Sequence, residues 1–431
     1  MEVKVISREM IKPSLPTPSH LRHLQQSFYD QMQRRVLIPY LSFYPNGCEG
    51  DSSATNVERS HKLKTSLADL LTKFYPLAGR VHDGHTECND EGVPYFEAQA
   101  CCRLSQVVGE SCLAKLNNLV PYRDWEDHDL PLAVQVNFFD CGRIAIGICC
   151  NHMVFDGVSI IYFINCWAAY ARGDHCELIN PIFDLPKLLP PKSLPSYNET
   201  STYKYNNQKI SAKRFVFTAS SLSALKAKFA NGLSSEAAPL SRIVVLSAFI
   251  WRRIVTQGNV SPTRRYLGFL MVNLRPWANP PLSESCFGNL VGFAKIGTSA
   301  DPAMIDGSEF VTCTRNAVKR NVDSFVKKLE NHASDGVQVD DYSTKPEDVN
   351  VKFSSFFNFP CYEADFGWGR PLRVTFAGSC FEDTVLYLPR ESGDGVEVLL
   401  YLKEDDMTKL ETDEEFLEFA SLDTKSDTKI C

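Results

Sequence analysis

One segment carries residues whose types and spacing could support proton transfer. The apolar run 144–150 is followed by Asn151, His152, Asp156 and Gly157, and a second apolar run then begins. This order predicts a buried strand that ends at a histidine loop and leads into a helix. Imidazole suits proton abstraction because its unperturbed pKa lies near neutrality, and loops that leave rigid strands often carry catalytic groups. The segment therefore predicts His152 as a general base.

The same spacing has a plainer interpretation. An H-x-x-x-D-G pattern is short and arises by chance, so His152 could be a core or capping histidine and Asp156 could simply precede a helix N-terminus. The segment needs independent support from elsewhere in the chain.

A second segment is unusual in composition. It reads Asp365-Phe366-Gly367-Trp368-Gly369. Its two glycines permit tight backbone turns, and the indole of Trp368 can anchor them by burial. Taken alone, this segment predicts a structural turn.

Helical and strand patterns alternate in both halves of the chain, which predicts an α/β fold with two domains. Between the halves, residues 181–195 are rich in proline and 196–208 are polar, which favours an ordered crossover between the domains. The spacing of apolar residues predicts helices over 59–75, 158–171, 219–230, 242–255, 309–330 and 405–421, strands over 95–98, 133–139, 144–150, 267–272 and 396–402, and a surface loop over 331–350.

Length and charge exclude several classes of protein. The chain has 431 residues, which suggests two or three domains, and its net charge of −7 comes without a basic stripe, which argues against nucleic-acid binding. Short basic pairs such as Lys213-Arg214 are interpreted as solvated. No run reaches the roughly 18 apolar residues of a membrane span, and no secretory signal is evident, so the cytosol is the expected location.

Cysteine usage fits a reducing compartment. The chain has 15 cysteines but no C-x-x-C pair, so no zinc ribbon or thioredoxin-type site is indicated. The adjacent pairs Cys101-Cys102 and Cys149-Cys150 lie in apolar runs and are predicted to be buried thiols.

The two unusual segments, in this order and in a chain of this length, resemble the plant BAHD acyltransferases, and the vinorine synthase-like branch in particular. The resemblance covers nearly the whole chain. Further matches occur in order at residues 13–18, 28–31, 75–80, 88–93, 273–275, 279–282, 288–289 and 392–397.

The resemblance implies two chloramphenicol acetyltransferase-like domains with mixed sheets and a solvent channel between them. Residues 1–180 would form the domain that carries H-x-x-x-D, 181–215 the crossover linker, and 216–431 the domain that carries D-F-G-W-G. An acyl-CoA, expected to be acetyl-CoA, would enter from one face and a small-molecule alcohol from the other. The expected product is an ester of a specialised metabolite such as an alkaloid or terpenoid. A monomer is expected, with no metal and no covalent acyl-enzyme.

The resemblance also implies roles for individual residues. His152 would take the proton of the acceptor hydroxyl, while Asp156 would pair with Arg275 and, with Gly157, fix the histidine loop. Asp365 would be structural in most interpretations of the family and catalytic in some, and Phe366 to Gly369 would complete its motif.

One departure from the family pattern concerns the oxyanion. Many members have Thr-Ser-Trp where this chain has Ser354, Ser355 and Phe356. A hydroxyl remains at Ser354, but the indole N–H is lost at Phe356. Ser354 is therefore the candidate side-chain donor to the oxyanion, with water or a backbone N–H as alternatives.

Other functions remain open. The chain could keep the fold as a non-catalytic binding protein, use an aromatic or longer acyl-CoA, or acylate an amine. A serine hydrolase is disfavoured because no G-x-S-x-G elbow occurs. Rossmann and P-loop enzymes are disfavoured because their glycine-rich phosphate motifs are absent.

Overall fold

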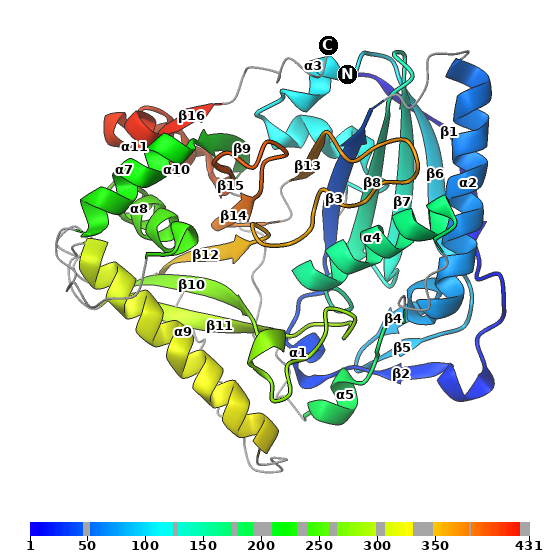
Figure 1. Cartoon of the computed structure of the whole chain (residues 1–431), viewed down its shortest axis with the longest axis horizontal. Helices are drawn as coiled ribbons and strands as arrows, with labels where there is room; N and C mark the ends of the chain where they lie inside the picture. Colours follow the sequence, from blue (N-terminus) through cyan, green and yellow to red (C-terminus); the bar gives the residue numbers. More distant parts are fainter. Residues whose placement is uncertain are drawn as a thin grey trace.

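Two large mixed sheets and one small sheet organise the chain in the computed structural model (Figure 1). The structure describes residues 1–45, 52–123, 128–174, 180–192, 209–230, 240–257, 265–298, 307–330, 348–378 and 381–422. In the described residues the small sheet has the order β2-β5-β4, formed by β2 (His23–Gln25), β5 (His85–Glu87) and β4 (Arg80–His82).

The first large sheet has the order β1-β6-β7-β8-β3-β13. All its pairs are antiparallel except β6 with β7. Its strands are β1 (Val3–Ile11), β6 (Val93–Ala100), β7 (Leu132–Phe139), β8 (Ile144–Asn151), β3 (Leu37–Tyr44) and β13 (Arg373–Phe376).

The second large sheet has the order β11-β10-β12-β14-β15-β9-β16. Its third strand in this order, β12, runs parallel to both neighbours, and its other pairs are antiparallel. Its strands are β11 (Val291–Thr298), β10 (Tyr266–Asn273), β12 (Val349–Ser355), β14 (Thr384–Leu388), β15 (Val396–Lys403), β9 (Ile210–Phe217) and β16 (Ala420–Leu422). The mixed sheets with helices give the expected α/β fold.

Helices cover each sheet (Figure 1). The first sheet carries α2 (Ser52–Lys73) and α4 (Gly157–Arg172), which pack against each other. Around the second sheet lie α7 (Ala219–Ala230), α8 (Arg242–Gln257), α9 (Gly307–Glu330), α10 (Glu404–Glu411) and α11 (Glu414–Phe419). Short helices α1 (Phe28–Gln31), α3 (Ser105–Val108) and α5 (Leu185–Leu188) lie in the connections of the first half.

Burial explains why β8 and α4 form where the apolar runs predicted them. All eight residues of β8 are buried, as in a strand covered on both faces. The helix α4 begins because the Asp156 carboxylate accepts a hydrogen bond of 2.9 Å from the Ser159 N–H, and it ends at Gly173, whose φ of 82° suits glycine. These two elements bracket the histidine loop.

Some predicted elements differ from the structure. The helix predicted over 405–421 is two helices, because the Asp413 carboxylate accepts a hydrogen bond from the Phe416 N–H and starts α11. Most of the loop predicted over 331–350 lies outside the described residues, but β12 already begins at Val349.

The domain boundaries remain a proposal and need two changes. The predicted linker 181–215 overlaps β9, which begins at Ile210 and already belongs to the second sheet. In the other direction, β13 comes from the second half of the chain but pairs with β3 in the first sheet. The division between the two domains is set by the hydrogen bonding of β9 and β13 in their sheets, which local sequence does not encode.

Two predictions about polar residues are wrong. Arg214 is 1% exposed and lies 3.8 Å from Glu397, because its strand β9 is inside the second sheet. Cys101 is exposed and Cys102 is half-buried, because both follow the end of β6, although Cys149 and Cys150 are buried in β8 as predicted.

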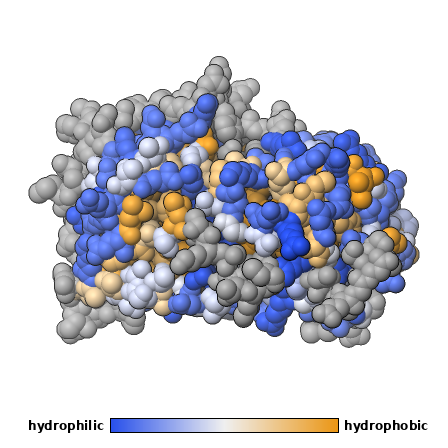
Figure 2. Space-filling model, turned by 90° about the horizontal axis from the view of Figure 1, so that it is seen from above, coloured by the Kyte–Doolittle hydropathy of each residue, from blue (hydrophilic) through white to orange (hydrophobic). Residues whose placement is uncertain are grey.

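The described surface has small hydrophobic patches. Figure 2 shows hydrophilic residues around the hydrophobic patches on the face viewed from above. None of the helices in the described ranges is both long and apolar enough to cross a lipid bilayer.

Candidate active site

The histidine loop is held by backbone hydrogen bonds on both sides. The His152 N–H donates to the Val36 carbonyl at 2.9 Å, and the Asn289 side chain donates to the His152 carbonyl at 2.8 Å. Asn151 closes the turn, because its side chain accepts from the Met153 N–H and donates to the carbonyl of His128. The loop therefore has little freedom to move the imidazole.

The imidazole of His152 is partly accessible, but its Nδ1 is buried and has no hydrogen-bond partner among the described residues. Burial lowers the pKa of His152, and this outweighs the opposing effects of the Asp156 charge, loop carbonyls and Asn289. A lowered pKa keeps the imidazole neutral at pH 7, which is the form that can accept a proton.

Asp156 and Arg275 form the predicted ion pair. Arg275 Nη1 lies 2.6 Å from Asp156 Oδ2, and both side chains are 1% exposed. The carboxylate also accepts from the N–H groups of Ser159 and Leu290, at 2.9 and 3.1 Å. With its lone pairs directed to these donors, Asp156 holds the start of α4 and forms no hydrogen bond with the His152 imidazole.

Arg275 joins the two halves of the chain at this point. It lies at the start of a short 3₁₀ helix that follows β10, and its remaining donors reach the carbonyls of Cys286 at 3.0 Å and Gly288 at 2.8 Å. The Gly288 carbonyl also accepts from the Ser159 hydroxyl of α4. Removing either Asp156 or Arg275 would leave the charge of the other buried and unpaired, in a network that connects both sheets.

Asp30 and Asn289 contribute a second connection that the sequence alone did not predict. The buried Asp30 carboxylate accepts from the backbone N–H and the side chain of Asn289 at 2.8 and 2.9 Å, and from the Ser27 hydroxyl at 2.6 Å. The same Asn289 side chain holds the His152 carbonyl. The only sequence signals for Asp30 and Asn289 were the family matches at 28–31 and 288–289. These matches gave no indication that the two segments touch.

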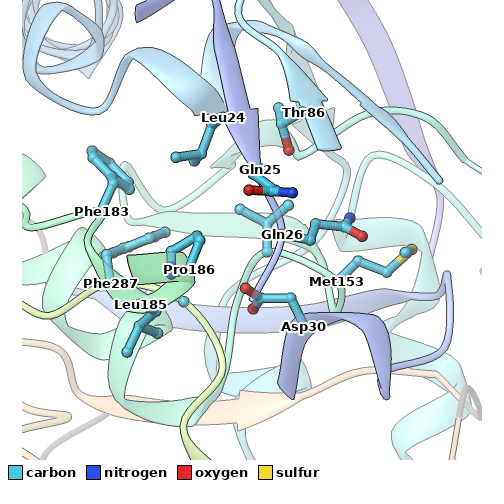
Figure 3. Close-up of a pocket in the computed structure, with 12 residues that line it drawn as sticks. Leu24, Gln25, Gln26, Asp30, Thr86, Met153, Phe183, Leu185, Pro186 and Phe287 are labelled. Carbon is cyan, nitrogen blue, oxygen red and sulfur yellow. The ribbon is translucent and has the colours of Figure 1, made fainter. Parts of the chain in front are cut away.

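A pocket lies beside this connection. Figure 3 shows Asp30 and Met153 on one side and apolar side chains on the other. The pocket is lined by Leu24, Gln25, Gln26, Asp30, Thr86, Met153, Val154, Phe183, Leu185, Pro186, Phe287 and Gly288. It adjoins the residues after His152 but not the imidazole itself.

The second motif forms a turn, in agreement with a structural role. Asp365 Oδ1 accepts from the N–H groups of Gly367 and Gly369 at 2.7 and 3.0 Å, and both glycines have positive φ, 102° and 104°. The Trp368 ring is 8% exposed and stacks on Phe366. Turn geometry therefore accounts for each residue of the motif.

The location of this motif differs from the prediction. The family resemblance places it in the second domain, but its side chains pack on β3 and α4 of the first half. The Phe366 ring contacts Trp167 of α4 and Tyr44 of β3, and Arg172 of α4 donates to the Asp365 carbonyl. The cause is β13, which follows the motif and belongs to the first sheet.

Ser354 lies near the end of β12, on a strand that leads toward the histidine loop. Two residues later, the Phe356 ring packs against the start of α4: a Cβ at Gly157 would lie 2.9 Å from Phe356 Cζ. This contact explains why glycine follows Asp156. The Ser354 hydroxyl has no hydrogen-bond partner among the described residues and is available to a ligand.

Comparison with known proteins decides the family. A model of the Transferase family, which comprises the BAHD acyltransferases, matches residues 1–417. The chain belongs to this family. Vinorine synthase of Rauvolfia serpentina is 33% identical over 95% of this chain and 96% of its own length, and stemmadenine O-acetyltransferase of Catharanthus roseus is 32% identical over 96% and 97%.

Solved structures agree with the membership of this BAHD chain. The crystal structure of vinorine synthase matches it with a TM-score of 0.80 at 29% identity, over 98% of this chain and 100% of that one. TRI101 of F. sporotrichioides, solved with coenzyme A and T-2, matches with a TM-score of 0.69 at 17% identity, over 93% and 99%, which shows a common fold. This BAHD chain is thus an acyl-CoA-dependent O-acyltransferase.

Loss of either partner of the ion pair should destabilise this BAHD enzyme and lower its activity. We expect Asp156→Asn and Arg275→Ala each to cost roughly 3–5 kcal/mol, because each leaves the other partner buried and unpaired. The double variant should lose less than the sum of the two. Thermal unfolding and kcat/KM of all four proteins measure this coupling.

Arg22→Ala serves as a control, because the Arg22 side chain is 44% exposed and its ion pair with Asp90 lies away from the histidine loop. Strictly additive losses for Asp156→Asn and Arg275→Ala would contradict the coupling.

Proposed function

We propose that this enzyme transfers an acetyl group from acetyl-CoA to a hydroxyl of a specialised metabolite, with His152 as the general base. The proposal rests mainly on one observation: a partly accessible histidine with a lowered pKa lies at the end of a buried strand, in a loop fixed from both halves of the chain. The choice of acetyl is supported by relatives that are named O-acetyltransferases, among them limonoid 1-O-acetyltransferase of Citrus sinensis.

The chemistry follows from a neutral imidazole. His152 takes the proton of the acceptor hydroxyl as the oxygen attacks the thioester carbonyl, which gives a tetrahedral oxyanion. The oxyanion then re-forms the carbonyl and expels the CoA thiolate, which takes up the proton from the imidazolium. The acyl group passes directly to the acceptor, and no step requires a metal or an acyl-enzyme.

The remaining site residues act by position in this proposal. Asp156, Arg275 and Gly157 fix the loop that presents His152, and the turn from Asp365 to Gly369 shapes the chain after β12. Asp365 is assigned a structural role because its carboxylate serves backbone N–H groups. A monomer in the cytosol remains the expectation from the sequence.

Two other chemistries use the same site. A longer or aromatic acyl-CoA would need more room beside Ser354, and an amine acceptor would need the same proton removal by His152. A non-catalytic binding protein would need no base, and the relatives named O-acetyltransferases favour the enzyme.

His152→Ala should stay folded and lose roughly 100- to 10,000-fold in transfer rate, the usual range for a missing general base. The assay mixes enzyme, acetyl-CoA and a panel of alcohols and measures release of free thiol together with formation of the ester. His61→Ala, which changes an exposed histidine of α2, is the matched control. Near-normal turnover by a folded His152→Ala would refute the assignment.

Ser354→Ala should lower kcat by about tenfold or more, because one donor to the developing oxyanion is lost. KM should change little, since this hydrogen bond would strengthen only in the transition state. Ser355→Ala is the control on the same strand, because the Ser355 hydroxyl already accepts a hydrogen bond from the Phe357 N–H. If Ser354→Ala keeps the wild-type kcat, another donor holds the oxyanion.

A further inference from the structure

Lys352 lies on β12, on the same face as Ser354. Side chains alternate along a strand, and Val351 and Phe353 are buried in the core under the helices of the second sheet. Lys352 and Ser354 therefore point to the opposite face. An ammonium on this face is unexpected, because the residues around it are mostly buried.

This face is turned toward the first half of the chain. Lys352 pairs in register with Thr384 of β14, and Ser354 pairs with Leu386. Leu386 and Phe356 belong to the hydrophobic core of the first sheet and its helices. Lys352 thus shares its face with side chains that meet the other half, on the strand that leads to the histidine loop.

No described carboxylate pairs with Lys352. Its side chain is half-buried, and among the described residues it has neither an ion pair nor a side-chain hydrogen bond. The charges of Asp383, Glu382 and Arg34 act on it from a distance, and burial, the largest influence, lowers its pKa. A half-buried amine without a partner gains most from a ligand that supplies a negative charge.

The position of Lys352 on β12 suits a single small molecule that reaches both Lys352 and His152. A strand rises about 3.3 Å per residue, so the Lys352 backbone lies roughly 7 Å from that of Ser354 and roughly 13 Å from that of Phe356, which contacts the start of α4. The lysine side chain can cover part of this distance. A ligand of the size of a polycyclic metabolite could place one end at His152 and another at Lys352.

We propose that Lys352 binds a carboxylate of the substrate, carried by the acceptor or by the acyl group, and so determines specificity. This inference rests on the proposed acyl transfer, because it places the carboxylate on a molecule that reacts at His152.

Two arms of one experiment separate the sources of the carboxylate. In the first arm, acetyl-CoA is combined with a series of hydroxy acids, and each acid is compared with its own methyl ester as the acceptor. In the second arm, succinyl-CoA is compared with acetyl-CoA on a neutral alcohol. The enzymes are the wild type, Lys352→Met, Lys352→Arg and the control Lys228→Met, which removes a surface lysine paired with Glu415.

We expect Lys352→Met to lower kcat/KM roughly 10- to 100-fold for the carboxylate member of one arm, as for a lost hydrogen bond to a charged group. The kcat/KM for the uncharged counterpart should change by less than about threefold, as for an ordinary surface substitution. Lys352→Arg should restore part of the preference, and Lys228→Met should behave as wild type. Thermal unfolding verifies that each variant folds.

Calorimetric binding of the same hydroxy acids and esters tests Lys352 without turnover. Tighter binding of acids than esters, lost in Lys352→Met, supports the inference even if no acceptor in the panel reacts. A wild type without carboxylate preference in binding and in both arms, or equal losses for acids and esters in Lys352→Met, overturns it. Transfer to neutral alcohols that persists in that case leaves the proposed function intact, whereas no transfer to any acceptor counts against that function.

Discussion

The buried ion pair between Asp156 and Arg275 is the interaction on which the rest of the site depends. Two charged groups that are 1% exposed are costly to bury, and only their mutual contact and full hydrogen bonding offset that cost. The contact can form only when the start of α4 meets the segment that follows β10. The start of α4, directly after the histidine loop, is therefore tied to the second half of the chain. In the proposed mechanism, the acid of the H-x-x-x-D motif acts on catalysis through position.

The proposed mechanism adds a second constraint, which is that the His152 imidazole must stay neutral. Its loop emerges from a fully buried strand, which removes water from Nδ1, and Asp156 is turned away toward Arg275. A carboxylate directed at the imidazole would favour the imidazolium, which cannot accept a proton. The ion pair thus serves two purposes, since it anchors the loop and engages the Asp156 carboxylate. Asn289 supports the loop from a different side, through the His152 carbonyl.

Local patterns in the sequence predicted the parts of the site that local residues determine. The apolar run of β8, the Asp156 cap and the apolar face of α4 are readable from spacing, and the family resemblance supplied Arg275 as a partner. Contacts that depend on tertiary pairing were not readable. Asp30 and Asn289 are 259 residues apart, and β13 joins the opposite sheet through backbone hydrogen bonds that no side chain signals. No local pattern singles out Lys352, because only the assembled face leaves it without a counter-ion among the described residues.

The charge state of His152 tests this account most directly. An enzyme labelled with ¹⁵N-histidine can be titrated by NMR, with His152→Ala used to assign the signal. We predict that His152 titrates below the ordinary value of 6.5, because burial disfavours the imidazolium, and that the acid limb of kcat/KM follows the same transition. A His152 pKa at or above 6.5, or an acid limb unrelated to it, would contradict a neutral histidine base held by the Asp156–Arg275 pair.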